Sequence, residues 1–241
     1  DRNISRVNTE SPPLQPIQKS AAPLRQQVVE EIRQSIITGA IPPSARLIER
    51  ELISLMGVSR TVIREALRQL ESEGLVIIIP NKGPVVRELT RAEARDLYAI
   101  RGVMEGLAAR LFVERGNDAQ LARLSEALDA TVAAYQDGDP QRVLETKNRF
   151  YAVLFEGAGS ETISSMMDTL YARISRWRAL GLAHPQRSPE RSGESIQGLR
   201  MMLKAIEARD ADRAETITRD EAAKAGAEVM RLLDETASSP A

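Results

Sequence analysis

The chain has 241 residues, with 33 Lys and Arg against 34 Asp and Glu, and a formal net charge of −1 at pH 7. It contains no cysteine and one histidine, which excludes disulfides, thiolate metal sites, cysteine nucleophiles and two-histidine metal sites within one chain. Its apolar runs fall well short of the ~18 residues that span a bilayer, and no signal-peptide pattern opens it. We therefore expect one or two soluble, cytoplasmic domains without a membrane partner.

Short helical patterns separated by turn residues occupy the first part of the chain. Residues 1–22 are rich in Pro, Ser and Gln, and we expect them to form a flexible arm. Apolar residues at three- and four-residue steps then predict a helix that ends at Thr38 and a short helix over residues 49–56. Gly57 is a good terminator for the short helix, and Ser59 is a natural cap for a third one.

Two brief β-branched runs follow the third helix. Residues 75–79 and 85–87 flank the turn residues Asn81, Lys82 and Gly83, a pattern that predicts a β-hairpin. A helix pair joined by a glycine turn and followed by a hairpin is typical of a winged helix-turn-helix, which we expect over residues 23–89.

Strand signals vanish after Thr90. Helical periodicity recurs in segments joined by short loops, which predicts an all-α bundle over residues 90–236 and a disordered tail over 237–241. The expected helices cover residues 90–116, 118–135, 140–156, 160–180, 192–208 and 210–236, with a loop over 181–189. The predicted fold class is mainly α: a winged helix-turn-helix followed by a helical bundle.

The helix after Ser59 has two distinct faces. Apolar residues occupy one side, whereas Arg60, Arg64 and Arg68 recur every four residues on another, so their guanidinium groups project in one direction. Thr61 lies near the N-terminus, where backbone N–H groups can also meet a phosphate. A helix whose first turn enters the major groove of DNA needs this arrangement. The alternative is a solvated basic stripe paired with glutamates of the same helix.

Cations on the neighbouring elements favour the DNA interpretation. Arg50 opens the preceding helix, where a backbone phosphate would pass. Lys82 and Gly83 lie at the hairpin tip, where glycine permits close backbone approach to a groove and lysine supplies charge. The alternative here is an ordinary surface turn.

A family resemblance covers nearly all of residues 24–88. It rests on the sequences IITGAIPP at 36–43, RLIEREL at 46–52 and GVSRTVIREALRQLESEGLV at 57–76. These resemble the DNA-binding domain of GntR-family bacterial transcription regulators. Ser44 departs from the pattern, since the family usually has Gly there. The resemblance implies operator contacts, for which the matching positions are Arg50, Arg60, Arg64 and Gly83, with Ser59 and Thr61 beside them.

The helical part is similar to the FCD effector domain of the FadR-like branch. The matching sequences are LYAIRGVME at 97–105, NRFYAVL at 148–154 and AIEARD at 205–210. The resemblance implies that this domain binds a small effector and carries the contact of a homodimer. Many members hold a divalent metal through one Asp and three His. The matching places here hold Lys147, Tyr151, Leu199 and Glu221, so we expect no metal and no cofactor.

Cationic residues of the bundle indicate a different ligand chemistry. Arg101 lies on an otherwise apolar helix, at a place where FCD domains often have a cavity-lining Arg, and Lys147, Tyr151 and Arg173 lie on later helices. Buried cations with a tyrosine hydroxyl suit a carboxylate, such as an organic or sugar acid, bound in bidentate fashion by Arg101. We expect Arg101→Ala to abolish the effector response and leave the fold intact. The alternative is that Arg101 pairs with Glu105.

These patterns predict a sequence-specific DNA-binding transcription regulator rather than an enzyme. Its partners would be double-stranded operator DNA, a second copy of the chain and a small anionic effector, and repression is the commoner mode in the family. One alternative is an enzyme or metabolite-binding protein whose winged helix contacts another protein, but no nucleophile–base pair or phosphate-cradling glycine loop supports it. Another is a DNA-packaging protein, which the near-neutral charge disfavours.

Overall fold

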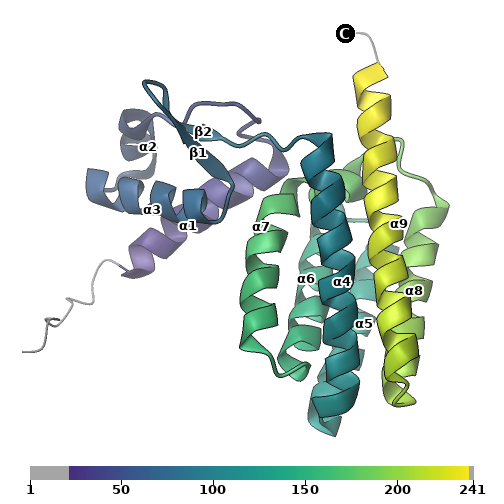
Figure 1. Cartoon of the computed structure of the whole chain (residues 1–241). Helices are drawn as coiled ribbons and strands as arrows, with labels where there is room; N and C mark the ends of the chain where they lie inside the picture. The colour runs from purple at the N-terminus through teal and green to yellow at the C-terminus, as the bar shows by residue number, and fades with distance from the viewer. Residues whose placement is uncertain (1–21, 239–241) are drawn as a thin grey trace, which may run out of the picture.

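The computed structural model describes residues 22–238, and within that range a helical unit that includes a β-hairpin is followed by a second unit made of helices (Figure 1). The bounds are α1 (Ala22–Thr38), α2 (Glu49–Met56), α3 (Arg60–Ser72), β1 (Val76–Ile79), β2 (Gly83–Val86), α4 (Arg91–Arg115), α5 (Asp118–Asp137), α6 (Pro140–Gly157), α7 (Glu161–Ala183), α8 (Glu190–Glu207) and α9 (Ala211–Ser238). The predicted arm lies outside the described residues except for Ala22, and so do residues 239–241 of the predicted tail.

The amino-terminal unit has its own apolar core between α1, α3 and the hairpin. Ile63 and Leu70 of α3 are fully buried, and they pack with Val29 and Ile32 of α1. The one-sided spacing of these residues is what makes each segment an amphipathic helix, and burying each large aliphatic side chain contributes about 1.5–3 kcal/mol. The winged helix-turn-helix predicted from the sequence is therefore the fold of this unit.

Backbone turns set the angles between the elements of this unit. Gly57 adopts a left-handed φ of 64° and ends α2, and the Ser59 hydroxyl then accepts a hydrogen bond from the Val62 N–H at 3.4 Å. Ser44 also has a left-handed φ, of 62°, although it is not a glycine. Its N–H donates to the Val86 carbonyl at 3.0 Å, so the hairpin holds Ser44 in this conformation.

The wing is an antiparallel pair in which Val76 faces Val86 and Ile79 faces Gly83. Its second strand begins at Gly83, two residues earlier than the sequence pattern indicates. A further bridge joins Arg46 to the middle of this strand. The hairpin is thus tied to the segment between α1 and α2 as well as to α3.

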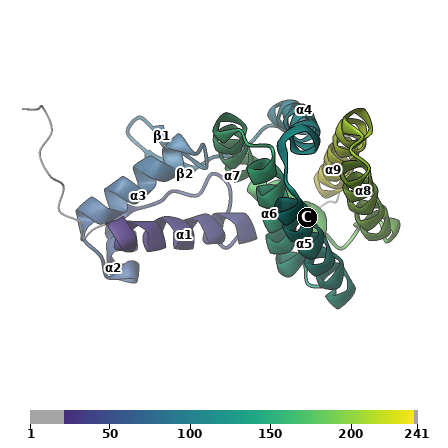
Figure 2. The ribbon, with the colours of Figure 1, turned by 90° about the horizontal axis from the view of Figure 1, so that it is seen from below.

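Helices α4 to α9 form the second unit, in which α4 lies along α9, α5 along α6 and α8 beside α9 (Figures 1 and 2). Their core is apolar and includes the fully buried side chains of Phe112, Phe150, Leu154, Met167 and Leu199. The all-α bundle predicted from the sequence is confirmed.

Several helices run past their expected bounds, among them α5, which continues to Asp137. Helix α7 continues through Gly181 to Ala183, and α9 continues to Ser238, two residues past the expected end. Gly181 is a packing position instead of a terminator, because a Cβ built there would lie only 2.9 Å from the Val229 Cγ2 of α9. The glycine allows the two helices to approach closely.

Helix α7 also connects the two units. It lies on the side of the bundle that faces the amino-terminal unit and contacts α1 (Figure 2). Ala172 packs against the amino-terminal core. The side chain of Arg173 lies against Gly74, where an added Cβ would meet the Arg173 Cγ at 3.1 Å.

Candidate functional site

The exposed face of α3 carries the predicted DNA-contacting arginines. Because Ser59 starts the helix and the apolar face is buried against α1, Arg60, Arg64 and Arg68 are all exposed, one turn apart. Thr61 is exposed beside them in the first turn. The structure therefore brings these residues together on one surface of the amino-terminal unit.

Two of these arginines have carboxylate partners. The Arg64 Nε donates to the Glu49 carboxylate of α2 at 2.9 Å, and the Arg68 Nη1 donates to Glu65 at 2.9 Å. The side chains of Arg64 and Arg68 are 55% and 71% exposed. Exposed ion pairs of this kind contribute about 0–1 kcal/mol, so a DNA phosphate or base can replace the carboxylate at small cost.

The remaining predicted DNA contacts lie on α2 and the wing. Arg50 is exposed near the start of α2, next to the partner of Arg64. Lys82 is exposed at the hairpin tip, and Gly83 has a left-handed φ of 84°. The wing residues belong to a different element from the α3 arginines.

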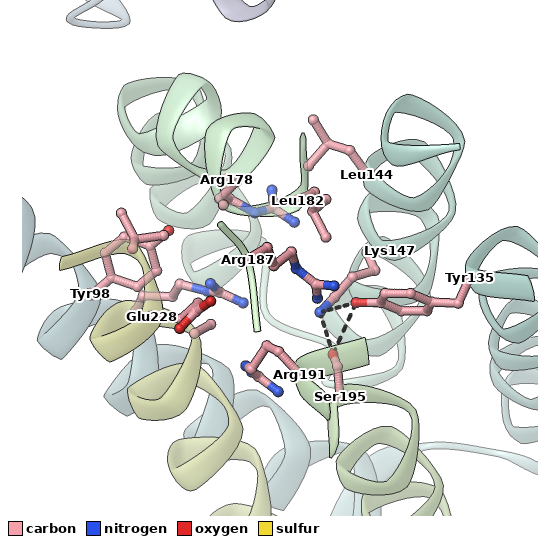
Figure 3. Close-up of a pocket in the computed structure, with 14 residues that line it drawn as sticks. Tyr98, Tyr135, Leu144, Lys147, Arg178, Leu182, Arg187, Arg191, Ser195 and Glu228 are labelled. Atoms are coloured by element: carbon pink, nitrogen blue, oxygen red, sulfur yellow. Dashed lines mark hydrogen bonds between the residues drawn. The ribbon is translucent and has the colours of Figure 1, made fainter. Parts of the chain in front are cut away.

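A cavity of about 50 Å³ in the bundle is lined by residues of α4, α5, α6, α7, α8, α9 and the loop before α8 (Figure 3). Its lining residues are Tyr98, Arg101, Tyr135, Leu144, Lys147, Arg178, Gly181, Leu182, Arg187, Arg191, Ser195, Ala225, Glu228 and Val229. Cationic side chains predominate among the charged groups. The cavity contains Arg101 and Lys147, two of the four predicted effector contacts.

Arg101 is buried and already paired. Its Nε donates to Glu105 at 2.6 Å, and its guanidinium lies 5.5 Å from the ring centre of Tyr98. The Tyr171 hydroxyl also donates to Glu105. Burial disfavours the charged form, but the buried Glu105 carboxylate outweighs it and raises the pKa of Arg101 further above its ordinary value. The alternative pairing considered from the sequence is the one present in the structure.

Lys147 belongs to a second buried polar network. Its ammonium donates to the Ser195 hydroxyl at 2.9 Å and lies 3.8 Å from Glu221. Ser195 donates to the same Glu221 oxygen at 2.7 Å, and Arg191 donates to it at 3.0 Å. Burial raises the pKa of Glu221, but Lys147 and Arg191 outweigh that effect and keep this pKa below its ordinary value. Tyr135 completes the wall, with its hydroxyl 3.1 Å from Ser195.

The other two predicted effector contacts lie outside this cavity. Tyr151 is fully buried in the core beneath Arg101, and burial raises the pKa of its hydroxyl well above the ordinary value. Arg173 points toward Gly74 of the amino-terminal unit instead of the bundle interior. The sequence spacing placed it on the correct helix but could not define the direction in which that helix presents it.

The residues at the metal positions of the family do not form a metal shell. Lys147 and Glu221 are ion-paired, Leu199 is apolar, and the Tyr151 hydroxyl is buried without a hydrogen-bond partner. Among residues 22–238, no group of three or more His, Asp and Glu side chains gathers to hold a metal ion. An ammonium beside the single carboxylate repels a cation, so these residues do not fit the metal.

A larger groove of about 530 Å³ separates the two units. It lies between α1 of the amino-terminal unit and α6 and α7 of the bundle. Leu144 and Arg178 line both this groove and the bundle cavity. The two hollows therefore share a wall.

Comparison with protein families identifies both units. The model described as bacterial regulatory proteins, gntR family, matches residues 24–86. The FCD domain model matches residues 96–222, more than half of the chain. The chain belongs to the GntR family. It is therefore a transcription regulator with a DNA-binding winged helix-turn-helix and an FCD domain. The family resemblance inferred from the sequence is confirmed.

Several curated relatives of this GntR-family regulator are themselves regulators. It is 27% identical over 184 residues to the HTH-type transcriptional regulator McbR of Escherichia coli K12, covering 76% of this chain and 82% of McbR. It is 27% identical over 197 residues to the HTH-type transcriptional repressor GlaR of the same organism, covering 78% of this chain and 87% of GlaR. Because its relatives and both of its domains are regulatory, the enzyme alternative is rejected.

Solved structures have the same fold as the GntR-family regulator. E. coli McbR/YncC superposes with a TM-score of 0.74 at 23% identity, over 88% of this chain and 98% of McbR. A GntR regulator from Rhodococcus sp. RHA1 superposes with a TM-score of 0.71 at 25% identity, over 87% of this chain and 98% of its own. No helix within residues 22–238 has the length and apolar character to cross a membrane.

Sequence reasoning missed three cavity arginines of the GntR-family regulator. Arg178 lies near the end of α7, Arg187 in the loop that follows, and Arg191 in the first turn of α8. One signal was available: Arg178 lies seven residues after Tyr171, on the same face of a helix, and its guanidinium stacks 4.2 Å from that ring centre. The loop arginine had no periodic pattern that pointed inward.

Proposed function

We propose that this GntR-family regulator is a homodimeric repressor that binds a two-fold operator and releases it when a small anionic metabolite enters the bundle cavity. The observation that carries the proposal is one helix, α7, that borders both functional regions. Ala172 of α7 packs against the DNA-binding unit, whereas Arg178 lines the cationic cavity. An anion that binds differently in two positions of α7 would shift the equilibrium between them.

Operator contact is assigned to α3 and the wing. The exposed row formed by Arg60, Arg64 and Arg68 would enter the major groove of DNA. Lys82 and Gly83 would contact the adjacent groove. Arg50 would contact the intervening phosphate backbone. Ser59 and Thr61 place short hydroxyl side chains at the tip of α3, where backbone N–H groups also face outward.

The dimer contact is assigned to α4. Ile100, Val103 and Leu107 are 48%, 50% and 38% exposed and recur at three- and four-residue steps, so they form one apolar stripe on this helix. Exposure of such a stripe is unfavourable in water, and the same stripe on a second copy would cover it.

Operator binding can be tested with duplexes selected by the protein from a random library. We expect a two-fold symmetric site that binds roughly 10³-fold or more tightly than random DNA. Arg64→Ala should weaken this complex by about 1–3 kcal/mol and relax selectivity, since it removes a base contact. The matched control is Arg200→Ala, an exposed arginine of α8. Equal retention of selected and random DNA at every salt concentration would instead indicate DNA packaging.

Effector control can be tested with a thermal-shift screen of organic acids and sugar acids, each with and without added divalent metal. We expect at least one acid to raise the melting temperature without metal and to release the selected operator duplex. An acid that acts only with metal would overturn the metal-free assignment. Failure of every acid to release operator would overturn the proposed anionic effector.

A further inference from the structure

We infer that the effector is a compact dianion, held by Arg178 and Arg191 with help from Arg187, and not by the Arg101 fork predicted from the sequence. This inference rests on the proposed function, since it specifies the charge and the contacts of the proposed anionic effector. The ligand class comprises short dicarboxylates and tetrahedral dianions such as sulfate or phosphate groups.

Carboxylates compensate the cavity cations only in part. Glu105 pairs with Arg101. Lys147 and Arg191 share the single buried carboxylate of Glu221, which leaves one positive charge in excess. Arg191 also forms an ion pair with Glu194, but this carboxylate is 54% exposed and lies 3.8 Å away, beyond hydrogen-bond distance, so water screens it.

Arg178 supplies the second uncompensated charge. It is 7% exposed and forms no ion pair with any described residue, and its guanidinium stacks on the Tyr171 ring. Arg187 is compensated, because it faces the Glu228 carboxylate, and Arg231, which also pairs with Glu228 at 2.8 Å, has a second carboxylate partner in Glu235. Burying charges without partners is costly in a low-dielectric interior, so a cavity with two uncompensated cations favours a ligand of charge −2.

Free N–H donors point to the same ligand. The Arg178 Nη2, the Arg187 Nε and the Arg191 Nη1 are buried and have no hydrogen-bond partner. Buried polar groups are satisfied in the great majority of cases, so three free donors around one cavity form a place where a water, an ion or a ligand can complete them. By contrast, the donors of Arg101 and Lys147 already contact Glu105 and Ser195.

The three arginines approach the cavity from different elements. Figure 3 shows Arg178 of α7, Arg187 of the following loop and Arg191 of α8 around the cavity, with Arg187 on the side of Lys147 and Tyr135. A planar guanidinium binds a carboxylate or a tetrahedral oxyanion with two parallel hydrogen bonds. One water molecule needs roughly 10–15 Å³ of cavity volume. The cavity volume of about 50 Å³ therefore suits a ligand of a few heavy atoms.

The test compares dianions with monoanions of the same shape at constant ionic strength. Full-length protein is unfolded thermally with sulfate or methanesulfonate, and with succinate or succinamate. We expect sulfate, succinate or both to raise the melting temperature at a concentration at least tenfold lower than the matched monoanion. The sulfate and succinate arms distinguish a tetrahedral from a dicarboxylate ligand.

Three variants locate the binding site. Arg178→Gln and Arg191→Gln should each weaken the dianion response at least tenfold, whereas Arg200→Gln, on the exposed face of α8, should retain it. Ligand-free Arg178→Gln should melt at or above the wild-type temperature, because it removes an unpaired buried charge. A lower melting temperature together with an unchanged dianion response would show that Arg178 is structural.

The outcomes separate this inference from the proposed function. Equal responses to monoanion and dianion would overturn the inference and leave the anionic effector standing. A dianion response retained by both arginine variants would place the ligand elsewhere and overturn the inference too. No response to any anion, combined with no release of operator, would overturn both.

Discussion

Ser44 is a single residue at which the sequence and the backbone conflict. Its left-handed φ of 62° costs an L-residue roughly 1–2 kcal/mol, and glycine adopts it freely. The hairpin imposes this conformation through the hydrogen bond from the Ser44 N–H to Val86. The hydroxyl adds only an exposed hydrogen bond to Glu88, at 3.0 Å.

Replacing Ser44 with glycine should therefore stabilise the amino-terminal unit. We expect Ser44→Gly to increase the free energy of unfolding by about 0.5–1 kcal/mol, after allowance for the greater entropy of unfolded glycine. Ser44→Ala is the control, since it keeps the strained φ and loses the hydroxyl. Chemical unfolding of both variants would contradict this account if the alanine protein were the more stable one.

Arg101 is a structural residue as well as a cavity residue. Removal of one partner of a buried ion pair leaves the other charge uncompensated, so Arg101→Ala should lower the free energy of unfolding by about 3–5 kcal/mol. The expectation that this variant keeps its fold intact is thus revised. The double variant Arg101→Met, Glu105→Gln should recover much of the loss in urea unfolding. A double variant no more stable than Arg101→Ala would count against the uncompensated-charge explanation.

At the scale of elements, the sequence predicted those helices and strands whose bounds depend on neighbouring residues in the chain. Helix α3 and the wing follow from alternating faces and turn residues, because Ser59, Gly57 and the hairpin glycine act on their own neighbours. Gly181 was misread because a terminating glycine and a packing glycine look alike in one dimension. The cavity arginines were missed for a related reason, since they converge only after α7 and α8 pack against the bundle.

Helix α4 gives a prediction about assembly. Val103 lies in the middle of the exposed apolar stripe, so Val103→Glu should place like charges opposite each other at a two-fold contact and shift the protein toward monomer. Sedimentation velocity measures the change. Met166→Glu, at a 55% exposed position of α7, is the matched control. A wild type that is monomeric, or a Val103→Glu protein with the wild-type dimer affinity, would remove α4 from the interface.

For the whole molecule, the dependence of stability on pH has an identifiable source. The pKa of Glu228 falls from its ordinary 4.5 to about 2, chiefly through hydrogen bonds from Arg231, with a further contribution from the Ser188 N–H. A carboxylate with a lowered pKa stabilises the fold above its unfolded pKa and loses that contribution as the pH falls. Glu228 thereby fastens α9 to the loop before α8.

Glu228→Gln should accordingly remove a stabilisation that depends on pH. We expect the melting temperature of the wild type to exceed that of the variant most at pH 6–7, and the difference to shrink as the pH falls from about 4.5 toward 2. Glu126→Gln, on the exposed face of α5, serves as control. A difference that is constant across this range would mean that Glu228 acts through packing alone.

Leu144 and Arg178 form a wall that the bundle cavity shares with the groove between the two units, so a change of shape in one at this wall changes the other. Helix α7 spans 23 residues, about 34 Å at 1.5 Å per residue, so it transmits a tilt at one end to the other with little bending. In the proposed dimer, two α3 helices that read DNA would have to match successive turns of the double helix, roughly 34–36 Å apart. A rotation of the amino-terminal unit by a few degrees relative to the bundle would thus be enough to move one α3 helix out of register with the DNA.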